Sequence, residues 1–155
     1  MPRQSVLNDK KIPQGFDCIQ GATPTRKALI MILGTGIDIV EVGRIESSYQ
    51  RFGERFLNRL LLPEEIRYCM AHRVPGPYLA ARFAAKEAVA KAFGTGIGSE
   101  LGWLDMEVFR KASGEPCLAL HGKALGLMAA RRALRVHLTL SHAQHYATAM
   151  AIIEG

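Results

Sequence analysis

The sequence predicts an α+β fold: a single compact domain in which a mainly antiparallel sheet packs against helices. Two pairs of short alternating segments, residues 105–120 and 136–153, each contain a tight turn and read as hairpins. Segments with helical spacing are grouped between the strands and do not alternate with each of them. A length of 155 residues favours one domain, and 48% apolar residues can form its core.

The first half begins with a strand and continues with helices. Residues 32–40 are apolar and include two glycines, which in a strand often mark close approach of a ligand or another backbone. Apolar residues at helical spacing predict a helix over about residues 41–59, and a proline followed by two glutamates opens another at residue 63. An alanine-rich helix is expected from residue 78 to about 93, where Gly94 ends it.

The second half is mostly strands. Met106 and Val108 alternate with more polar neighbours, Ser113-Gly114 forms a turn, and residues 117–120 return as the partner strand. A helix is expected over about residues 123–134. Alternation over residues 136–140, a turn near residue 143 and a last strand over residues 146–153 complete the domain.

Residues 1–30 differ from the rest because they hold three prolines and show no helical or strand period. They predict a disordered extension or a start codon read too far upstream, so the domain is expected over residues 31–155, with Met31 as its natural start. The chain has no apolar run near the roughly 20 residues of a membrane span. Its three cysteines form no CxxC or Cys/His ligand pair, which predicts neither a disulfide nor a zinc finger and favours the cytoplasm.

The expected alanine-rich helix carries the strongest candidate for chemistry. Glu87 and Lys91 are four residues apart and share a helix face. An exposed ion pair is the simplest interpretation. However, Gly94, Gly96 and Gly98 follow in a glycine-rich loop, whose backbone N–H groups can receive phosphate. The loop is neither a Walker A nor a Rossmann motif.

Asp38, at the end of the first strand, is the second candidate. It either caps the following helix or binds a metal ion. Two carboxylates from separate elements, completed by phosphate oxygens and waters, suit magnesium.

Four arginines at positions 44, 51, 55 and 59 form one stripe on the predicted helix. This stripe is a solvated face, a docking surface for an acidic protein helix, or a nucleic-acid site. Aromatic residues do not interleave with it as single-strand binding prefers. The net charge of +6 suits an acidic or phosphate-rich partner.

Ser141 and His142 are adjacent, but no GxSxG motif or third member makes them a hydrolase site. His142 could bind phosphate or hold the loop. A metallohydrolase is a weaker alternative, because the sequence offers no further residues that would complete a zinc site.

Together, GTGIDIVEVGRIE, RFAAKEAVAKAFGTGIG, a Gly-x-Pro turn and LSHAQHYATAMAII resemble the holo-acyl-carrier-protein synthase family over residues 31–153. The resemblance implies a homotrimer with active sites at its subunit interfaces. It also implies transfer of 4'-phosphopantetheine from coenzyme A to a serine of apo-acyl carrier protein in fatty acid biosynthesis.

By this resemblance Asp38 and Glu87 bind magnesium, and Lys91 lies near the phosphates and the leaving group. Arg44, Arg51 and Arg55 dock the acidic carrier helix. The phosphate and nucleotide contacts are Arg82, Gly94, Gly96, Gly98, Ser141 and His142. The family's Gly-Lys-Pro turn is here Gly114-Glu115-Pro116, which puts its contribution to coenzyme A affinity in doubt.

A competing hypothesis is a non-catalytic basic module that binds nucleic acid or an acidic protein. It explains the arginines but gives no role to Asp38 or to the pair Glu87 and Lys91. We therefore expect a transferase with coenzyme A and a carrier protein as partners, and neither nucleic acid nor membrane. The sequence does not specify which carrier protein is used.

Overall fold

The computed structural model describes residues 30–155, so the predicted extension over residues 1–30 lies almost wholly outside the described residues. Within them, strands form two antiparallel sheets. The larger sheet has the order β1-β5-β4, with β1 at Ile32–Glu41, β5 at Tyr146–Glu154 and β4 at Arg135–His142. The smaller sheet is the predicted hairpin, β2 at Met106–Arg110 and β3 at Pro116–Leu120.

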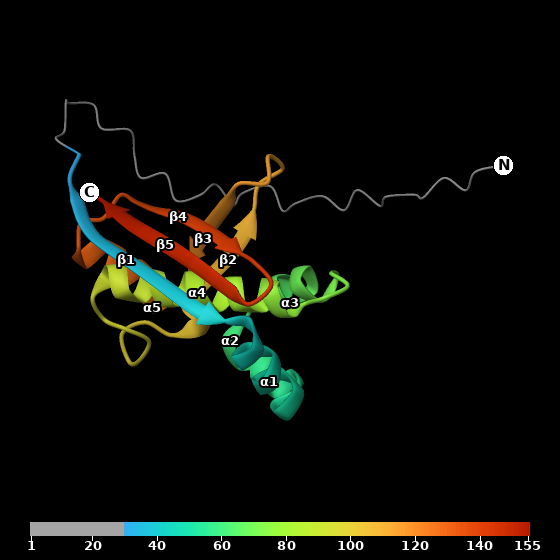
Figure 1. The fold of residues 1–155 in the computed structure, drawn as a ribbon. Coiled ribbons are helices and arrows are strands. Elements are labelled where there is room, and N and C mark those ends of the chain that lie inside the picture. Colours follow the sequence, from blue (N-terminus) through green and yellow to red (C-terminus); the bar gives the residue numbers. More distant parts are fainter. Residues whose placement is uncertain (1–29) are drawn as a thin grey trace.

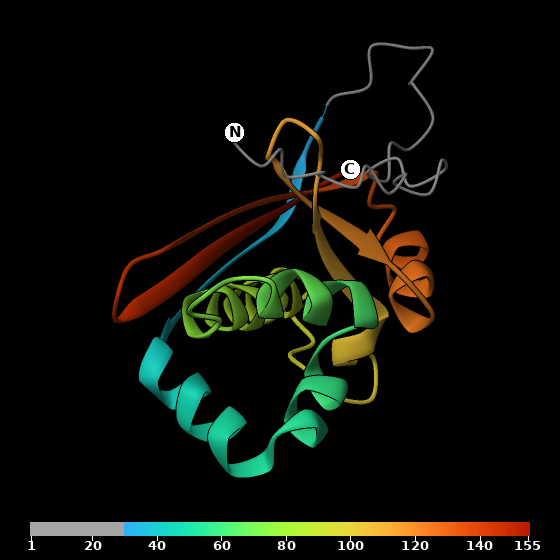
Figure 2. The same ribbon diagram turned by 90° about the vertical axis from the view of Figure 1, so that its right-hand side faces the viewer.

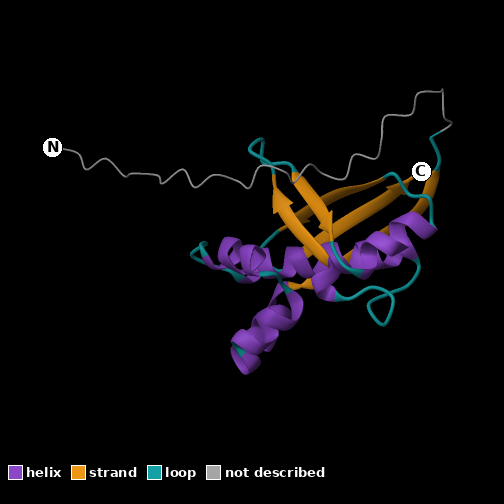
Figure 3. Cartoon of the chain, turned by 180° about the vertical axis from the view of Figure 1, so that it is seen from behind, coloured by secondary structure: helices purple, strands orange, loops and turns teal. Residues whose placement is uncertain are grey.

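The long helix α4 (Gly76–Phe93) crosses under the larger sheet (Figure 1). The remaining helices are α1 (Val42–Phe52), α2 (Glu54–Leu60), α3 (Pro63–Met70) and α5 (Lys123–Ala130), with a short 3-10 helix η1 (Trp103–Asp105). In Figure 2, α1 and α2 extend on the side of α4 that faces away from the larger sheet. Seen from behind, the helices lie along one side of the strands (Figure 3).

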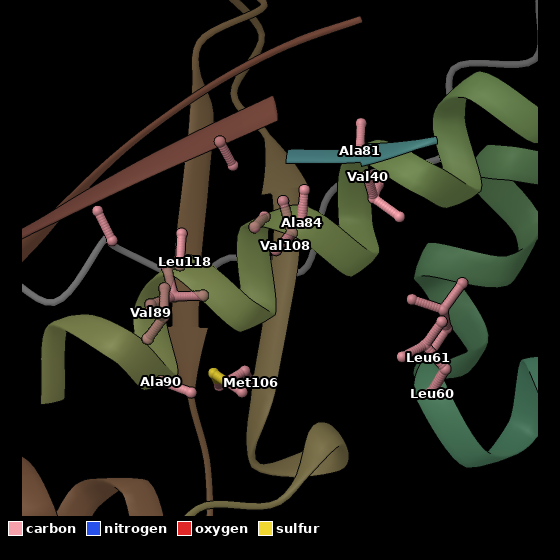
Figure 4. Packing of buried hydrophobic residues seen from close by; sticks show 14 of the residues in the cluster. Val40, Leu60, Leu61, Ala81, Ala84, Val89, Ala90, Met106, Val108 and Leu118 are labelled. Carbon is pink, nitrogen blue, oxygen red and sulfur yellow. The ribbon is translucent and has the colours of Figure 1, made fainter. Parts of the chain in front are cut away.

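Small side chains let α4 lie in the middle of the domain. Its alanines are fully buried, and the inner face of β5 also presents alanines at positions 147, 149 and 151. Figure 4 shows Ala84 of α4 beside Val108 of β2, and Val89 of α4 beside Leu118 of β3. Both sheets therefore pack against one helix, α4.

Two glycines of β1 determine how closely it approaches α4. A Cβ on Gly36 would lie 2.0 Å from the carbonyl oxygen of Ala88, and one on Gly34 would lie 2.1 Å from that of Ala92. Either side chain would collide with backbone. The sequence predicted close approach of either a ligand or another backbone at these glycines. The structure shows that the close neighbour is the backbone of α4.

The structure corrects two predicted helices. The helix expected over residues 41–59 is broken at Gly53, whose φ of 56° and ψ of −135° suit glycine, so the arginine stripe is divided between α1 and α2. The helix expected over residues 123–134 ends at Ala130, and Arg132 adopts a left-handed φ of 53°.

Cys69, on α3, is a buried free thiol. Among residues 30–155, no helix has the length and apolarity needed to cross a membrane.

Candidate active site

Asp38, Glu87 and Lys91 come together where β1 crosses α4. Lys91 Nζ donates to Asp38 Oδ1 at 2.7 Å and to the carbonyl oxygen of Ile37 at 3.1 Å. Burial raises the pKa of Glu87, the charge of Asp38 raises it further, and Lys91 opposes both. Lys91 thus forms its ion pair with Asp38 across elements and not with Glu87 along the helix.

Asp38 does not cap the helix that follows it. Glu41 occupies the N-cap position of α1, and no side chain donates or accepts a capping hydrogen bond there. The Asp38 side chain lies instead on the face of β1 that meets α4, with 14% of it exposed. The capping alternative is therefore wrong, and the carboxylate is left available to the site.

A cavity of about 810 Å³ opens beside the two carboxylates. Asp38 and Glu87 form one part of its wall, and Arg44 of α1 forms another. Phe56 and Phe83 separate it from a second cavity of about 580 Å³, and their side chains line both. The two cavities thus adjoin along these rings.

The second cavity combines cations with aromatic rings. Its wall includes Arg55 and Arg59 from α2, with the ring of Trp103 from η1, 5.0 Å from that of Phe83 between centroids. Arg51 lines neither cavity and lies over the ring of Phe52, 4.9 Å from its centroid. Because the helix is broken at Gly53, Arg44 lines the cavity beside the carboxylates, whereas Arg55 lines the second cavity.

Arg82 and His142 belong to a different cluster. Arg82 and Glu87 are five residues apart on α4, about 140° around its axis, and so point to different sides. The Arg82 guanidinium lies 4.1 Å from the ring centroid of Tyr68, and His142 packs edge-on against Tyr78. Burial, Arg110, Arg82 and His72 lower the pKa of His142, in that order.

Ser141 does not join His142. Adjacent side chains of a strand point to opposite faces of the sheet. His142 contacts Tyr78 on the helix side, so Ser141 faces outward, where it lines a small cavity with Ile37 and Met150. The two neighbours in sequence therefore lie on opposite faces of the larger sheet.

The glycine-rich loop follows α4 as predicted, and Gly94 ends the helix with a left-handed φ of 71°. Its backbone donors are occupied, however. The N–H groups of Gly94, Gly96 and Gly98 donate to the carbonyl oxygens of Lys91, Ala90 and Leu101. The expected phosphate cradle of free N–H groups is thus absent at these three positions, and any role in binding must come from other groups of the loop.

Residues 34–151 match the family model described as the 4'-phosphopantetheinyl transferase superfamily. The chain belongs to this superfamily. The holo-[acyl-carrier-protein] synthase of Koribacter versatilis is 52% identical over 124 residues, which are 80% of this chain and 99% of that relative.

Solved structures of the family share the fold. The holo-[acyl-carrier-protein] synthase of Neisseria meningitidis superimposes with a TM-score of 0.76 at 35% identity, covering 81% of this chain and all of that one. The Helicobacter pylori enzyme in complex with coenzyme A gives 0.69 at 34% identity, covering 77% and 98%. These matches confirm the predicted α+β fold and the resemblance. They lend no support to a non-catalytic basic module.

Several residues of this superfamily member were missed from its sequence. Phe83 lines both cavities, and its position one turn before Glu87 was a helical-spacing signal for the same face. Tyr78 stands one turn before Arg82 in the same way. Trp103 gave no such signal, because only the tertiary structure brings η1 against α4. Glu65 and Lys86, buried and paired, were likewise not singled out as a pair.

Proposed function

We propose that this chain transfers 4'-phosphopantetheine from coenzyme A to a serine of an apo-acyl carrier protein and releases adenosine 3',5'-bisphosphate. The observation that carries this proposal is the meeting of Asp38, Glu87 and Lys91 where β1 crosses α4, with the two carboxylates in the wall of the larger cavity. Membership of the superfamily and the coenzyme A complex of the Helicobacter pylori relative support it.

The carboxylates fit a magnesium ion. Asp38 and Glu87 are oxygen donors close enough for the charge of one to raise the pKa of the other. Among residues 30–155, no three His, Cys, Asp or Glu side chains gather to hold a metal ion, so the remaining ligands would be phosphate oxygens and waters, as magnesium prefers. Bound there, the ion would neutralise charge on the pyrophosphate.

The proton and charge transfers fall to Glu87 and Lys91. The carrier serine oxygen bonds to the β-phosphorus of coenzyme A, and the bond from that phosphorus to the bridging oxygen breaks. Glu87, whose raised pKa makes it a stronger base, accepts the serine proton. Lys91, with 48% of its side chain exposed, stabilises the leaving phosphate.

The cluster of Arg82 and His142 suits the nucleotide end of coenzyme A. The Arg82 side chain is almost fully buried, and within the described residues its Nε has no hydrogen-bond partner. Because this cluster faces away from Glu87, we propose that two subunits of a homotrimer complete each site. The outward face of β1 offers the apolar surface for this assembly, with Ile37 65% and Ile39 68% exposed.

We propose that the carrier protein docks over the second cavity. Arg55 and Arg59 would meet acidic side chains, and Arg44 and Arg51 would extend the basic surface along α1. Binding should then weaken as salt is added. The setting we propose is fatty acid biosynthesis in the cytoplasm.

Intact-protein mass spectrometry of an apo-acyl carrier protein tests the transfer. Incubation with the chain, coenzyme A and magnesium should add the mass of one phosphopantetheine. The gain should vanish with chelator and in Asp38→Ala and Glu87→Ala. A folded chain that modifies none of several apo carriers, with and without magnesium, would refute the proposal.

A further inference from the structure

A buried ion pair connects the helix of Glu87 to the walls of the second cavity. The Lys86 ammonium and the Glu65 carboxylate are both fully buried, with Nζ and Oε2 2.7 Å apart. Burial lowers the pKa of Lys86, and the charge of Glu65 opposes this effect. The pair has no part in the chemistry proposed above, because neither Lys86 nor Glu65 lines the carboxylate cavity.

The other partners of Lys86 are carbonyl oxygens of the cavity wall. Nζ donates at 2.8 Å to Leu60, the last residue of α2, and at 3.0 Å to Trp103 in η1. Both residues line the second cavity. The three donors of the ammonium are thus matched by three acceptors.

Glu65 extends the connection to two more segments. Its Oε2 also accepts a hydrogen bond from the N–H of Leu62 at 2.9 Å, and its Oε1 accepts one from the N–H of Val108 at 3.0 Å. The start of α3 and the strand β2 are thereby held to the same pair. Lys86, the residue that precedes Glu87 in sequence, therefore connects α2 and η1, which line the second cavity, to α3 and β2 through Glu65.

We infer that Lys86 and Glu65 are positioning residues. They hold the wall of the second cavity, which includes Arg55, Arg59 and Trp103, at a set distance from Glu87. The inference rests on the proposed function and assigns the pair to carrier recognition and not to coenzyme A binding. A buried pair that only stabilised the fold would affect both substrates alike. Loss of the pair should loosen η1 and the end of α2 and leave Asp38 and Lys91 in contact.

Lys86→Met tests the inference, with Glu65→Gln beside it and Glu64→Gln as the matched control. Glu64 is the neighbouring residue on α3, but its side chain is 62% exposed and pairs with Arg67 at the surface. The KM for apo-carrier should rise about tenfold or more in the two buried-pair variants, whereas the KM for coenzyme A should stay within about twofold. Glu64→Gln should match the wild type in both.

Trp103 is the single tryptophan of the chain and supplies a second readout. Acrylamide should quench its fluorescence more strongly in Lys86→Met than in the wild type, because its carbonyl anchor is lost. This measurement needs no turnover. Unchanged quenching would therefore indicate that the inference is wrong. An inactive wild type would instead indicate that the proposed function is wrong.

Equal changes in both KM values, or unchanged quenching in a folded variant, would overturn the inference. Should Lys86→Met not fold, Lys86→Gln retains an N–H donor of shorter reach and takes its place. If neither folds at low temperature by circular dichroism, the pair has a structural role only, and the inference is wrong.

Discussion

At the scale of single residues, Lys91 illustrates that an exposed ion pair contributes little to the free energy of unfolding. It pairs with Asp38 at 2.7 Å, but its side chain is 48% exposed, so solvent screens the attraction. Its value lies in where the charge is held, beside two carboxylates at the cavity. A surface ion pair elsewhere, whose lysine is similarly exposed, provides the comparison.

Lys91→Met should lower the free energy of unfolding by no more than about 1 kcal/mol. The rate of phosphopantetheine transfer should fall by about a hundredfold or more, because a charge facing the leaving phosphate is lost. Urea unfolding and mass-spectrometric initial rates measure the two effects. The control is Lys111→Met, which loses a surface pair with Glu115 of 2.9 Å. Equal rates for the two variants would exclude a catalytic role for Lys91.

His142 should make the fold sensitive to acid. Its pKa in the fold lies below the ordinary value of 6.5, chiefly because of burial and then because of nearby arginines. As the pH falls through about 6.5, the unfolded chain takes up this proton before the folded chain does, so the free energy of unfolding decreases. His142→Gln should lose less stability between pH 7.5 and about 5. Urea titrations at each pH that give parallel curves for the two proteins would contradict this.

At the scale of elements, the crossing of β1 over α4 creates the site. Gly34 and Gly36 bring the strand against the carbonyl oxygens of the helix, and Asp38, two residues further on, then reaches Lys91. Asp38 on the strand, and Glu87 and Lys91 on the helix, each keep ordinary geometry. Close approach of two backbones, and not strain in either, brings their side chains together.

Gly36→Ala should therefore separate β1 from α4. The new Cβ would lie 2.0 Å from the Ala88 carbonyl oxygen and 2.6 Å from the Ala92 nitrogen, and neither backbone atom can move aside alone. We expect a loss of about 2–4 kcal/mol in the free energy of unfolding. Gly126→Ala is the control, because open space surrounds it in α5 and alanine should stabilise that helix by about 0.5–1 kcal/mol. Similar urea midpoints for both variants would refute this account of the crossing.

At the scale of the whole molecule, residues 30–155 bury one face of the larger sheet and leave apolar side chains exposed on the other. The inner face packs on α4, whereas Ile37, Ile39 and Met150 remain exposed on the outer face. An apolar sheet surface of this kind is typical of contacts between subunits. In the proposed site, Glu87 and Arg82 point to different sides of α4, so the proposed assembly would bring the two groups together from different subunits.

Ile39→Lys should disrupt the proposed homotrimer, because the proposed interface would have to bury a lysine ammonium group on this apolar face. Size-exclusion chromatography with light scattering should give a trimer for the wild type and a smaller species for the variant, with an unchanged circular dichroism spectrum. Leu125→Lys, on α5 and 52% exposed in the wild type, should leave the mass unchanged. A monomeric wild type, or a trimeric Ile39→Lys, would rule out this interface.

Local patterns in the sequence determined the hairpins, the limits of α4 and its end at Gly94, because alternation, helical spacing and glycine preferences act between near neighbours. The same spacing placed Glu87 and Lys91 on one face of that helix. It failed for the first helix, where Gly53 breaks a periodic segment and separates Arg44 from Arg55 and Arg59, which line a different cavity.

Only the tertiary structure decided which distant residues meet. Lys91 forms its pair with Asp38, Ser141 and His142 lie on opposite faces, and Lys86 joins Glu65 in the interior. The donors of the glycine-rich loop turned out to be occupied by carbonyl oxygens of its own surroundings. These contacts depend on how closely a strand and a helix can approach, which small residues permit but which no spacing along the chain specifies.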